Sequence, residues 1–189
     1  MKVDVLTVGF LGTNCYVISD SSNKAVLIDP GADARSIIEF LSKNNLSLEA
    51  ILITHTHFDH VGGLKKVAEK TGAVIYMRAD EVNREYFTLS RDINDSDKIT
   101  VGEMTFKIIA TPGHTPDGMS FLAEDCLFSG DTLFYNNIGR YDLPGGDISV
   151  LTDSLKKIRD LPFEDLKIFP GHMQQTTLQH ERLHNRFMK

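Results

Sequence analysis

An apolar run passes directly into a polar cluster in the sequence Ala50-Ile51-Leu52-Ile53-Thr54-His55-Thr56-His57-Phe58-Asp59-His60. Four consecutive apolar residues of this kind are typical of a buried strand, so we expect the polar cluster at the carboxyl end of that strand. Three imidazoles and a carboxylate are costly to bury without partners. A cation removes that cost, because neutral imidazole and ionised carboxylate are ligands for zinc, iron and manganese. The stretch therefore predicts a metal site, and a solvated loop rich in histidine is the alternative.

The spacing within this cluster predicts two cations. In an extended segment, side chains two positions apart point the same way, so His55 and His57 can hold one ion together. Asp59 and His60 follow where the chain must turn into a helix, and we expect them to point elsewhere and to hold a second ion.

The composition is that of one ordinary globular domain. The chain has 189 residues, of which 41% are hydrophobic and 24% charged, enough for a substantial core. A formal net charge of −6 argues against a nucleic-acid surface, which is usually basic. No window reaches the roughly 20 apolar residues of a membrane helix, and the first six residues lack the features of a signal peptide. We therefore expect a cytoplasmic protein with a small-molecule substrate and no nucleic-acid or membrane partner, and we interpret Cys15 and Cys126 as reduced thiols. The sequence does not determine the oligomeric state.

Ligand-type residues recur where other predicted strands end. The strand that finishes at Ala110 leads to His114, the strand 126–128 leads to Asp131, and the strand 166–169 leads to His172. Four strand ends that present such residues imply a common point in space. The other expected elements are strands at 3–8, 15–19, 25–28, 73–77 and 119–123, a strand pair within 99–110, helices at 34–43, 61–70, 80–87, 151–158 and after residue 177, and a loop at 89–98. Because there is neither a repeat nor a low-complexity linker, residues 1–189 are expected to form one domain.

Asp29 lies at the end of the predicted strand 25–28, which Pro30 and Gly31 stop. Functional groups collect at such strand ends in layered α/β folds. Asp29 is therefore either an outer acceptor that orients a ligand histidine or a turn residue.

In this order, the ligand-type residues give the chain a clear family likeness. The motif His55-x-His57-x-Asp59-His60, followed by His114, Asp131 and His172, resembles the metallo-β-lactamase superfamily, and within it most closely the short glyoxalase II-like proteins (hydroxyacylglutathione hydrolases). The likeness extends over nearly the whole chain and implies an α+β fold, a four-layer αββα sandwich with the metals at one edge of the two sheets. It also implies which residues hold which ion: His55, His57 and His114 one ion, Asp59, His60 and His172 the other, with Asp131 bridging both.

The resemblance implies a metal-dependent hydrolase. A metal-bridging hydroxide would attack a small thioester similar to S-D-lactoylglutathione, with Asp59 and Asp131 as the catalytic carboxylates. Two divalent cations per chain are expected, zinc first and iron or manganese as alternatives. Members that hydrolyse antibiotics typically have Cys or Ser at the bridging position, so Asp131 argues against a β-lactamase. The alternative function is a persulfide dioxygenase with one non-haem iron on His55, His114 and Asp131.

The substrate-binding part of the chain departs from full-length glyoxalase II. The additional helical region that helps bind glutathione has no counterpart after His172, and Met173 stands where the family has a substrate-binding Tyr. Arg140, within the family-like segment 138–147, could pair with a substrate carboxylate, because guanidinium matches carboxylate bidentately. A structural salt bridge within its loop is the other interpretation.

The sequence His180-Glu181-Arg182-Leu183-His184 matches the zinc-protease motif H-E-x-x-H. A protease of that kind needs a third ligand, usually downstream, and only five residues follow His184. We therefore interpret this stretch as a terminal helix that packs on the domain.

Overall fold

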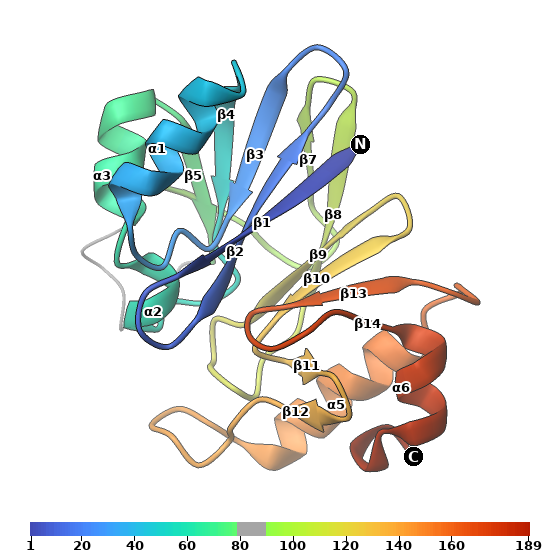
Figure 1. The fold of residues 1–189 in the computed structure, drawn as a ribbon. Helices are drawn as coiled ribbons and strands as arrows, with labels where there is room; N and C mark the ends of the chain where they lie inside the picture. The colour runs from blue at the N-terminus through green and yellow to red at the C-terminus, as the bar shows by residue number, and fades with distance from the viewer. Residues whose placement is uncertain (79–89) are drawn as a thin grey trace.

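Two six-stranded sheets face each other in the computed structural model, which describes residues 1–78 and 90–189 (Figure 1). The first sheet has the order β1-β2-β3-β4-β5-β6. Strand β2 is antiparallel to both β1 and β3, and β3 to β6 run parallel. The bounds are β1 Lys2–Val8, β2 Thr13–Ser19, β3 Lys24–Ile28, β4 Ser47–Leu52, β5 Val74–Met77 and β6 Ser90–Asp92.

The second sheet has the order β14-β13-β10-β9-β8-β7. Its strands are antiparallel to their neighbours except for the parallel pair β10 and β13. A separate hairpin of two short strands, β11 and β12, follows β10. The bounds are β7 Lys98–Val101, β8 Met104–Ala110, β9 Met119–Ala123, β10 Cys126–Gly130, β11 Leu133–Phe134, β12 Asn137–Ile138, β13 Lys167–Pro170 and β14 Thr176–Thr177.

Helices cover the outer faces of both sheets. Figure 1 shows α1 and α3 against the first sheet, and α5 and α6 beside the second. The carboxylate of Asp147 begins α5 by accepting hydrogen bonds from the backbone N–H groups of Ser149 and Val150. The bounds are α1 Ala34–Lys43, α2 Phe58–Val61, α3 Leu64–Thr71, α5 Ile148–Arg159, α6 Leu178–His184 and the terminal 3-10 turn η2 Arg186–Met188. The predicted α+β fold, a four-layer αββα sandwich, is confirmed.

Three apolar clusters fill the spaces between the four layers. Aliphatic and aromatic side chains together fill the cluster between the sheets, where Phe128 contacts Tyr16 and Phe169 at ring-centroid distances of 5.2 and 5.0 Å. A second cluster joins the first sheet to α1 and α3, and a third joins the second sheet to α5 and α6. Because β2 and β3 are covered on both faces, their apolar residues run nearly continuously.

One sequence prediction of local structure is wrong. The predicted loop 89–98 contains β6, which pairs in parallel with β5 at the edge of the first sheet. Its residues Ser90, Arg91 and Asp92 are polar and partly or fully exposed, so they carry no apolar pattern that would predict a strand. The predicted helix 80–87 lies outside the described residues. Strands β11, β12 and β14, with two residues each, were too short to predict.

Two further observations concern predictions made from composition. The thiols of Cys15 and Cys126 are buried and free, as expected. Over residues 1–78 and 90–189, no helix has both the length and the apolar character needed to cross a bilayer.

Candidate metal centre

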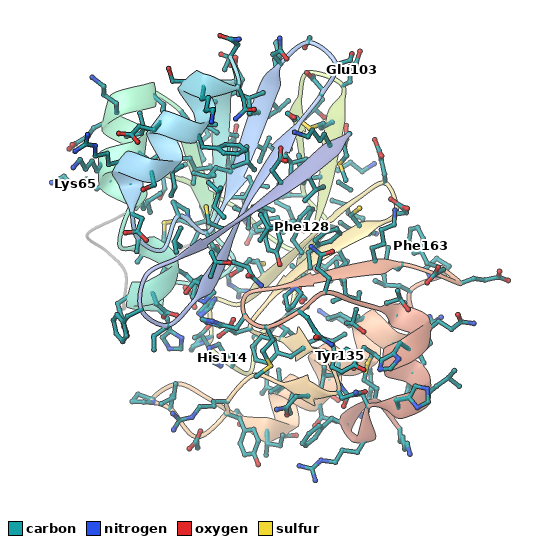
Figure 2. All side chains as sticks on the ribbon, in the orientation of Figure 1. Lys65, Glu103, His114, Phe128, Tyr135 and Phe163 are labelled. Atoms are coloured by element: carbon teal, nitrogen blue, oxygen red, sulfur yellow. The ribbon has the colours of Figure 1, made fainter. Side chains whose placement is uncertain are left out.

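The first predicted ligand pair lies just past the end of β4. His55 and His57 are separated by an extended segment, and their Nε2 and Nδ1 atoms are 3.1 Å apart. His114 reaches the same point from the loop after β8, with its Nε2 3.0 Å from Nδ1 of His57 (Figure 2). Three ring nitrogens from two different sheets therefore converge, as the sequence predicts.

The hydrogen bonds behind these rings fix which nitrogens face the centre. Nδ1–H of His114 donates to the backbone oxygen of Arg140 at 2.6 Å, and Nδ1–H of His55 donates to Thr54 Oγ1 at 3.0 Å. Both Nε2 atoms therefore present lone pairs. Nδ1 of His57 carries at most one proton, so it can donate to only one of these two Nε2 atoms. Lone pairs that converge in this way suit a bound cation.

A second group lies beside the first. Nε2 of His172, which follows β13, is 3.2 Å from Asp59 Oδ2 and 3.3 Å from Nε2 of His60. Asp59 and His60 come from the single-turn helix α2 and face His172, although the ring of His60 also lies 4.0 Å from the ring of His55. Thr13, at the start of β2, donates its hydroxyl to Asp59 Oδ2 at 3.1 Å. Nothing in the sequence pattern around Thr13 indicated this contact.

Asp131 faces both groups from the end of β10. Its Oδ1 is 3.5 Å from Nε2 of His60, and its Oδ2 is 3.5 Å from Nε2 of His114. Oδ1 is buried and has no hydrogen-bond partner. An ionised carboxylate oxygen is costly to bury in this state. Its position between two clusters of ring nitrogens fits a carboxylate shared by two cations.

Asp29 occupies the outer position that one of its two interpretations requires. Its Oδ2 accepts from Nδ1–H of His60 at 2.9 Å and from the hydroxyl of Thr54 at 2.6 Å, and its Oδ1 accepts from the backbone N–H of Thr54 at 2.8 Å. The residue has a φ of +52°, a conformation that is uncommon for residues other than glycine. Through Thr54, the same carboxylate also orients His55. Asp29 is thus in direct contact with the predicted ligands.

Glycines allow the loops around the centre to approach closely. A Cβ on Gly31 would lie 1.6 Å from the backbone oxygen of Asp59, and one on Gly62 would lie 2.4 Å from the backbone oxygen of Gly31. A Cβ on Gly171 would lie 2.2 Å from Oδ1 of Asp131. The paired glycines 62 and 63 therefore allow the start of the next helix to lie against the loop 30–32.

The electrostatics of the cluster also fit bound cations. Burial, followed by the charges of neighbouring histidines, lowers the pKa of His55 and His57. Burial alone would lower the pKa of His60, but Asp131 and Asp29 outweigh it and raise the pKa to about 9. The hydrogen bond with Asp59 raises the pKa of His172. Without a bound cation, protons on His60 and His172 therefore balance the negative charge of the neighbouring carboxylates.

The donor set and its spacing match zinc and related ions. Tetrahedral zinc with bonds of about 2.1 Å to nitrogen holds its ligands about 3.4 Å apart, a few tenths of an ångström more than the separations of 3.0 and 3.1 Å in the first group. Three clusters have their ligand atoms within 4.8 Å of one another: His55 with His57 and His114, Asp59 with His60 and His172, and Asp29 with His55 and His60. The third is accounted for by the hydrogen bonds that link Asp29 to His60 and, through Thr54, to His55. All seven predicted ligands are therefore brought together, and their role as ligands stays a prediction.

The centre opens into a cavity of about 660 Å³. Its floor consists of predicted ligands, and its walls come from the β1–β2 loop, α2, the β11–β12 hairpin and the loop after it. The lining residues are Leu11, Gly12, His57, Phe58, Asp59, His114, Asp131, Phe134, Asn137, Ile138, Arg140, Leu143, His172 and Met173. Most residues of the apolar wall come from short loops without a periodic pattern, so the sequence did not predict them.

Arg140 has the contact that its structural interpretation predicts. Its Nε and one terminal nitrogen donate to the two carboxylate oxygens of Asp142, each at 2.9 Å. Both side chains are largely exposed. Arg140 nevertheless lines the cavity, and its backbone oxygen orients His114, so its role toward a substrate stays a prediction.

The H-E-x-x-H stretch belongs to α6 and forms no part of this centre. Glu181 is fully buried and accepts hydrogen bonds from the backbone N–H of Asn136, the hydroxyl of Thr176 and the amide of Asn185. The ring of His180 stacks on Tyr135, at 4.9 Å between centroids. The packing of a terminal helix, which the sequence predicted, is confirmed, and Glu181 fixes the turn of the β11–β12 hairpin.

Comparison with known proteins assigns the family. The family model "Metallo-beta-lactamase superfamily" matches residues 8–172, and the chain belongs to this metallo-hydrolase superfamily. Hydroxyacylglutathione hydrolase GloC of Haemophilus influenzae is 31% identical in an alignment of 209 positions that covers 100% of this chain and 98% of that protein.

Two solved structures are also similar over nearly the whole chain. BLEG-1, a B3 metallo-beta-lactamase, has a TM-score of 0.90 and 33% identity and covers 99% of both chains. ETHE1 from Myxococcus xanthus has a TM-score of 0.88 and 30% identity, covering 98% of this chain and 84% of that one. The family is therefore shared by proteins with different names and activities.

Proposed function

We propose that this protein is a binuclear metallo-hydrolase that cleaves a small thioester, similar to S-D-lactoylglutathione, with water into a hydroxy acid and a thiol. The observation that carries the proposal is Asp131, whose two oxygens each lie 3.5 Å from a histidine of a different group. The similarity to GloC over the whole chain supports the choice of a thioester.

The seven residues would divide the work between two ions. His55, His57 and His114 would hold one cation, Asp59, His60 and His172 the second, and Asp131 would contact both. Bound divalent cations lower the pKa of water and polarise a carbonyl oxygen. Zinc fits this donor set, and iron and manganese accept the same ligand types.

The cavity residues support water as the nucleophile. Among the described residues that line the cavity there is no Ser, Thr, Cys, Lys or Tyr that could attack a carbonyl. The oxygen of water would form a bond to the acyl carbon, the carbon–sulfur bond would break, and the thiolate would take up a proton. Asp59 and Asp131 supply carboxylate oxygens beside the reacting carbonyl. Thr13 holds Asp59 in place through its hydroxyl.

Elemental analysis paired with a thioester assay tests this proposal. We expect two zinc ions per chain, hydrolysis of S-D-lactoylglutathione, and loss of this activity in a chelator with recovery on adding zinc. Asp131→Asn should lower kcat by at least about 100-fold, the size of effect that removal of one key polar group at the reacting centre has. The double variant with His180→Ala and His184→Ala should keep both metal and activity. Metal-loaded protein that is inert toward every acyl-thiol offered would contradict the proposal.

A second candidate function is a persulfide dioxygenase with one non-haem iron. The similarity to ETHE1 favours it, together with the convergence of His55, His114 and Asp131, which could form a facial triad of two histidines and one carboxylate. This alternative predicts one iron per chain and oxygen uptake with a persulfide. Two zinc ions and no oxygen uptake would exclude it.

A further inference from the structure

The mouth of the cavity has an exposed apolar surface. Leu11 is 48% exposed, Phe58 64% and Met173 61%, and all three line the cavity although they belong to different segments. The ring of Phe58 also stacks on Phe10, with centroids 6.2 Å apart. Exposed apolar side chains that gather around one opening are typical of a binding surface.

Met173 holds its place at this mouth in an unfavourable backbone conformation. Its φ is +67°, in the left-handed region that favours glycine. The amide of Asn14 donates to the backbone oxygen of Met173 at 2.9 Å, which helps to hold that conformation. A side chain that is kept exposed at such a position, directly after His172, is more useful for contact with a ligand than for packing.

The mouth offers no unpaired cation among the described residues. Within residues 1–78 and 90–189, Arg140 is the one lysine or arginine that lines the cavity, and both oxygens of Asp142 already accept from it. A negatively charged part of a substrate would therefore lose water at this opening without gaining a partner.

We infer that the thiol half of the substrate is uncharged, of the N-acylcysteamine class, and lies against Leu11, Phe58 and Met173. This inference rests on the proposed thioester hydrolysis and narrows its substrate. Glutathione carries two carboxylates, which the apolar mouth does not accommodate. An uncharged amide arm places methylene groups against the three side chains and keeps its polar atoms toward water.

A matched pair of substrates tests the inference. S-D-lactoyl-N-acetylcysteamine and S-D-lactoylglutathione share the acyl group and differ only in the thiol. With the metal-loaded protein, we expect kcat/KM to be about tenfold or more higher for the uncharged thioester, because the carboxylates of the other must be desolvated. Equal values, or a preference for the glutathione thioester, would overturn the inference.

A binding measurement separates this result from the proposed function. If neither thioester is hydrolysed, the proposed function fails, and calorimetry with two stable thioethers still decides the inference. S-hexyl-N-acetylcysteamine should then bind more tightly than S-hexylglutathione. The reverse order would overturn the inference whatever the activity.

Introducing a positive charge at the mouth gives a third test, which has a control variant outside the cavity. Met173→Lys keeps a Cβ at the same backbone conformation and adds one cation, so it should shift the kcat/KM ratio toward the glutathione thioester about fivefold, the size of one exposed ion pair. Leu183→Lys is the control, since Leu183 is 63% exposed on α6 and does not line the cavity. If Met173→Lys does not fold, Leu11→Lys takes its place in this test. An unchanged ratio in the mouth variants, or the same shift in the control, would contradict the inference.

Discussion

Replacing the carboxylate of Asp29 by an amide should loosen the metal centre without replacing a predicted ligand. Asp29→Asn exchanges one of two acceptor oxygens for an N–H donor. In either orientation the new donor meets an existing donor, either the backbone N–H of Thr54 or the hydroxyl of Thr54 and Nδ1–H of His60. A hydrogen bond to a charged group contributes about 1.5–3 kcal/mol.

That energy translates into a measurable loss of metal affinity. Each 1.4 kcal/mol corresponds to about a tenfold change in a binding constant, so zinc should bind about 10–100-fold more weakly, as is typical when the partner of a ligand histidine is removed. Competition with a chromophoric chelator measures the affinity, and elemental analysis gives the number of ions per chain. Because Asp29 contacts His60 directly, we expect the ion held by Asp59, His60 and His172 to be lost first.

A matched variant controls for general destabilisation. Asp160→Asn makes the same atomic exchange in an exposed ion pair with Arg159 and should leave zinc affinity unchanged. Zinc affinity in Asp29→Asn within twofold of the parent protein would show that the hydrogen bonds behind the histidines do not hold the centre in place, and our reasoning would be wrong.

Three further predictions follow from contacts in and around the centre. Gly171→Ala should reduce bound metal, because its Cβ would lie 2.2 Å from Oδ1 of Asp131 and force the carboxylate to move; elemental analysis checks this, and unchanged metal content would contradict it. In metal-free protein the raised pKa of His60, about 9, means that zinc binding at pH 7–8 should release protons and that the release should fade above pH 9; calorimetry in buffers of different ionisation enthalpy measures it. The same shift stabilises the metal-free protein fully below pH 6.5, and this contribution should be lost as pH rises through 9. Glu181→Ala leaves buried donors unpaired and should lower the free energy of unfolding in urea by about 1–3 kcal/mol, whereas Leu183→Ala, on the exposed side of α6, should change it little.

The convergence of the candidate ligands could be predicted because its signal is local. The cluster His55–His60 is dense enough to be expensive without a cation, and each remaining predicted ligand follows a strand with a clear apolar pattern. Parallel or adjacent strands place their ends near one another, so position along the chain was enough to predict convergence. Apolar runs and helical spacing likewise predicted most of the strands and the covering helices, whereas their arrangement as two sheets in four layers was implied by the family resemblance.

The substrate side could not be predicted because its contacts depend on loops. The sequence leaves open whether Arg140 pairs with a substrate or with Asp142, since only the backbone conformation of the loop decides which carboxylate is within reach. The exposed position of Met173 depends on a backbone angle that no pattern encodes. Edge strand β6 was missed because polar, exposed residues show no periodicity. The organisation of residues 1–189 as one domain stays a prediction.

The distribution of the predicted ligands over both sheets has a mechanical consequence. His55, His57, Asp59 and His60 follow β4 of one sheet, whereas His114, Asp131 and His172 follow strands of the other. Bound ions would therefore link the two sheets at this edge of the sandwich, in addition to the aromatic side chains packed between them. Removing the ions should allow the two sheets to separate locally at that edge first. Amide hydrogen exchange should then become faster in these loops, while the strands behind them stay protected.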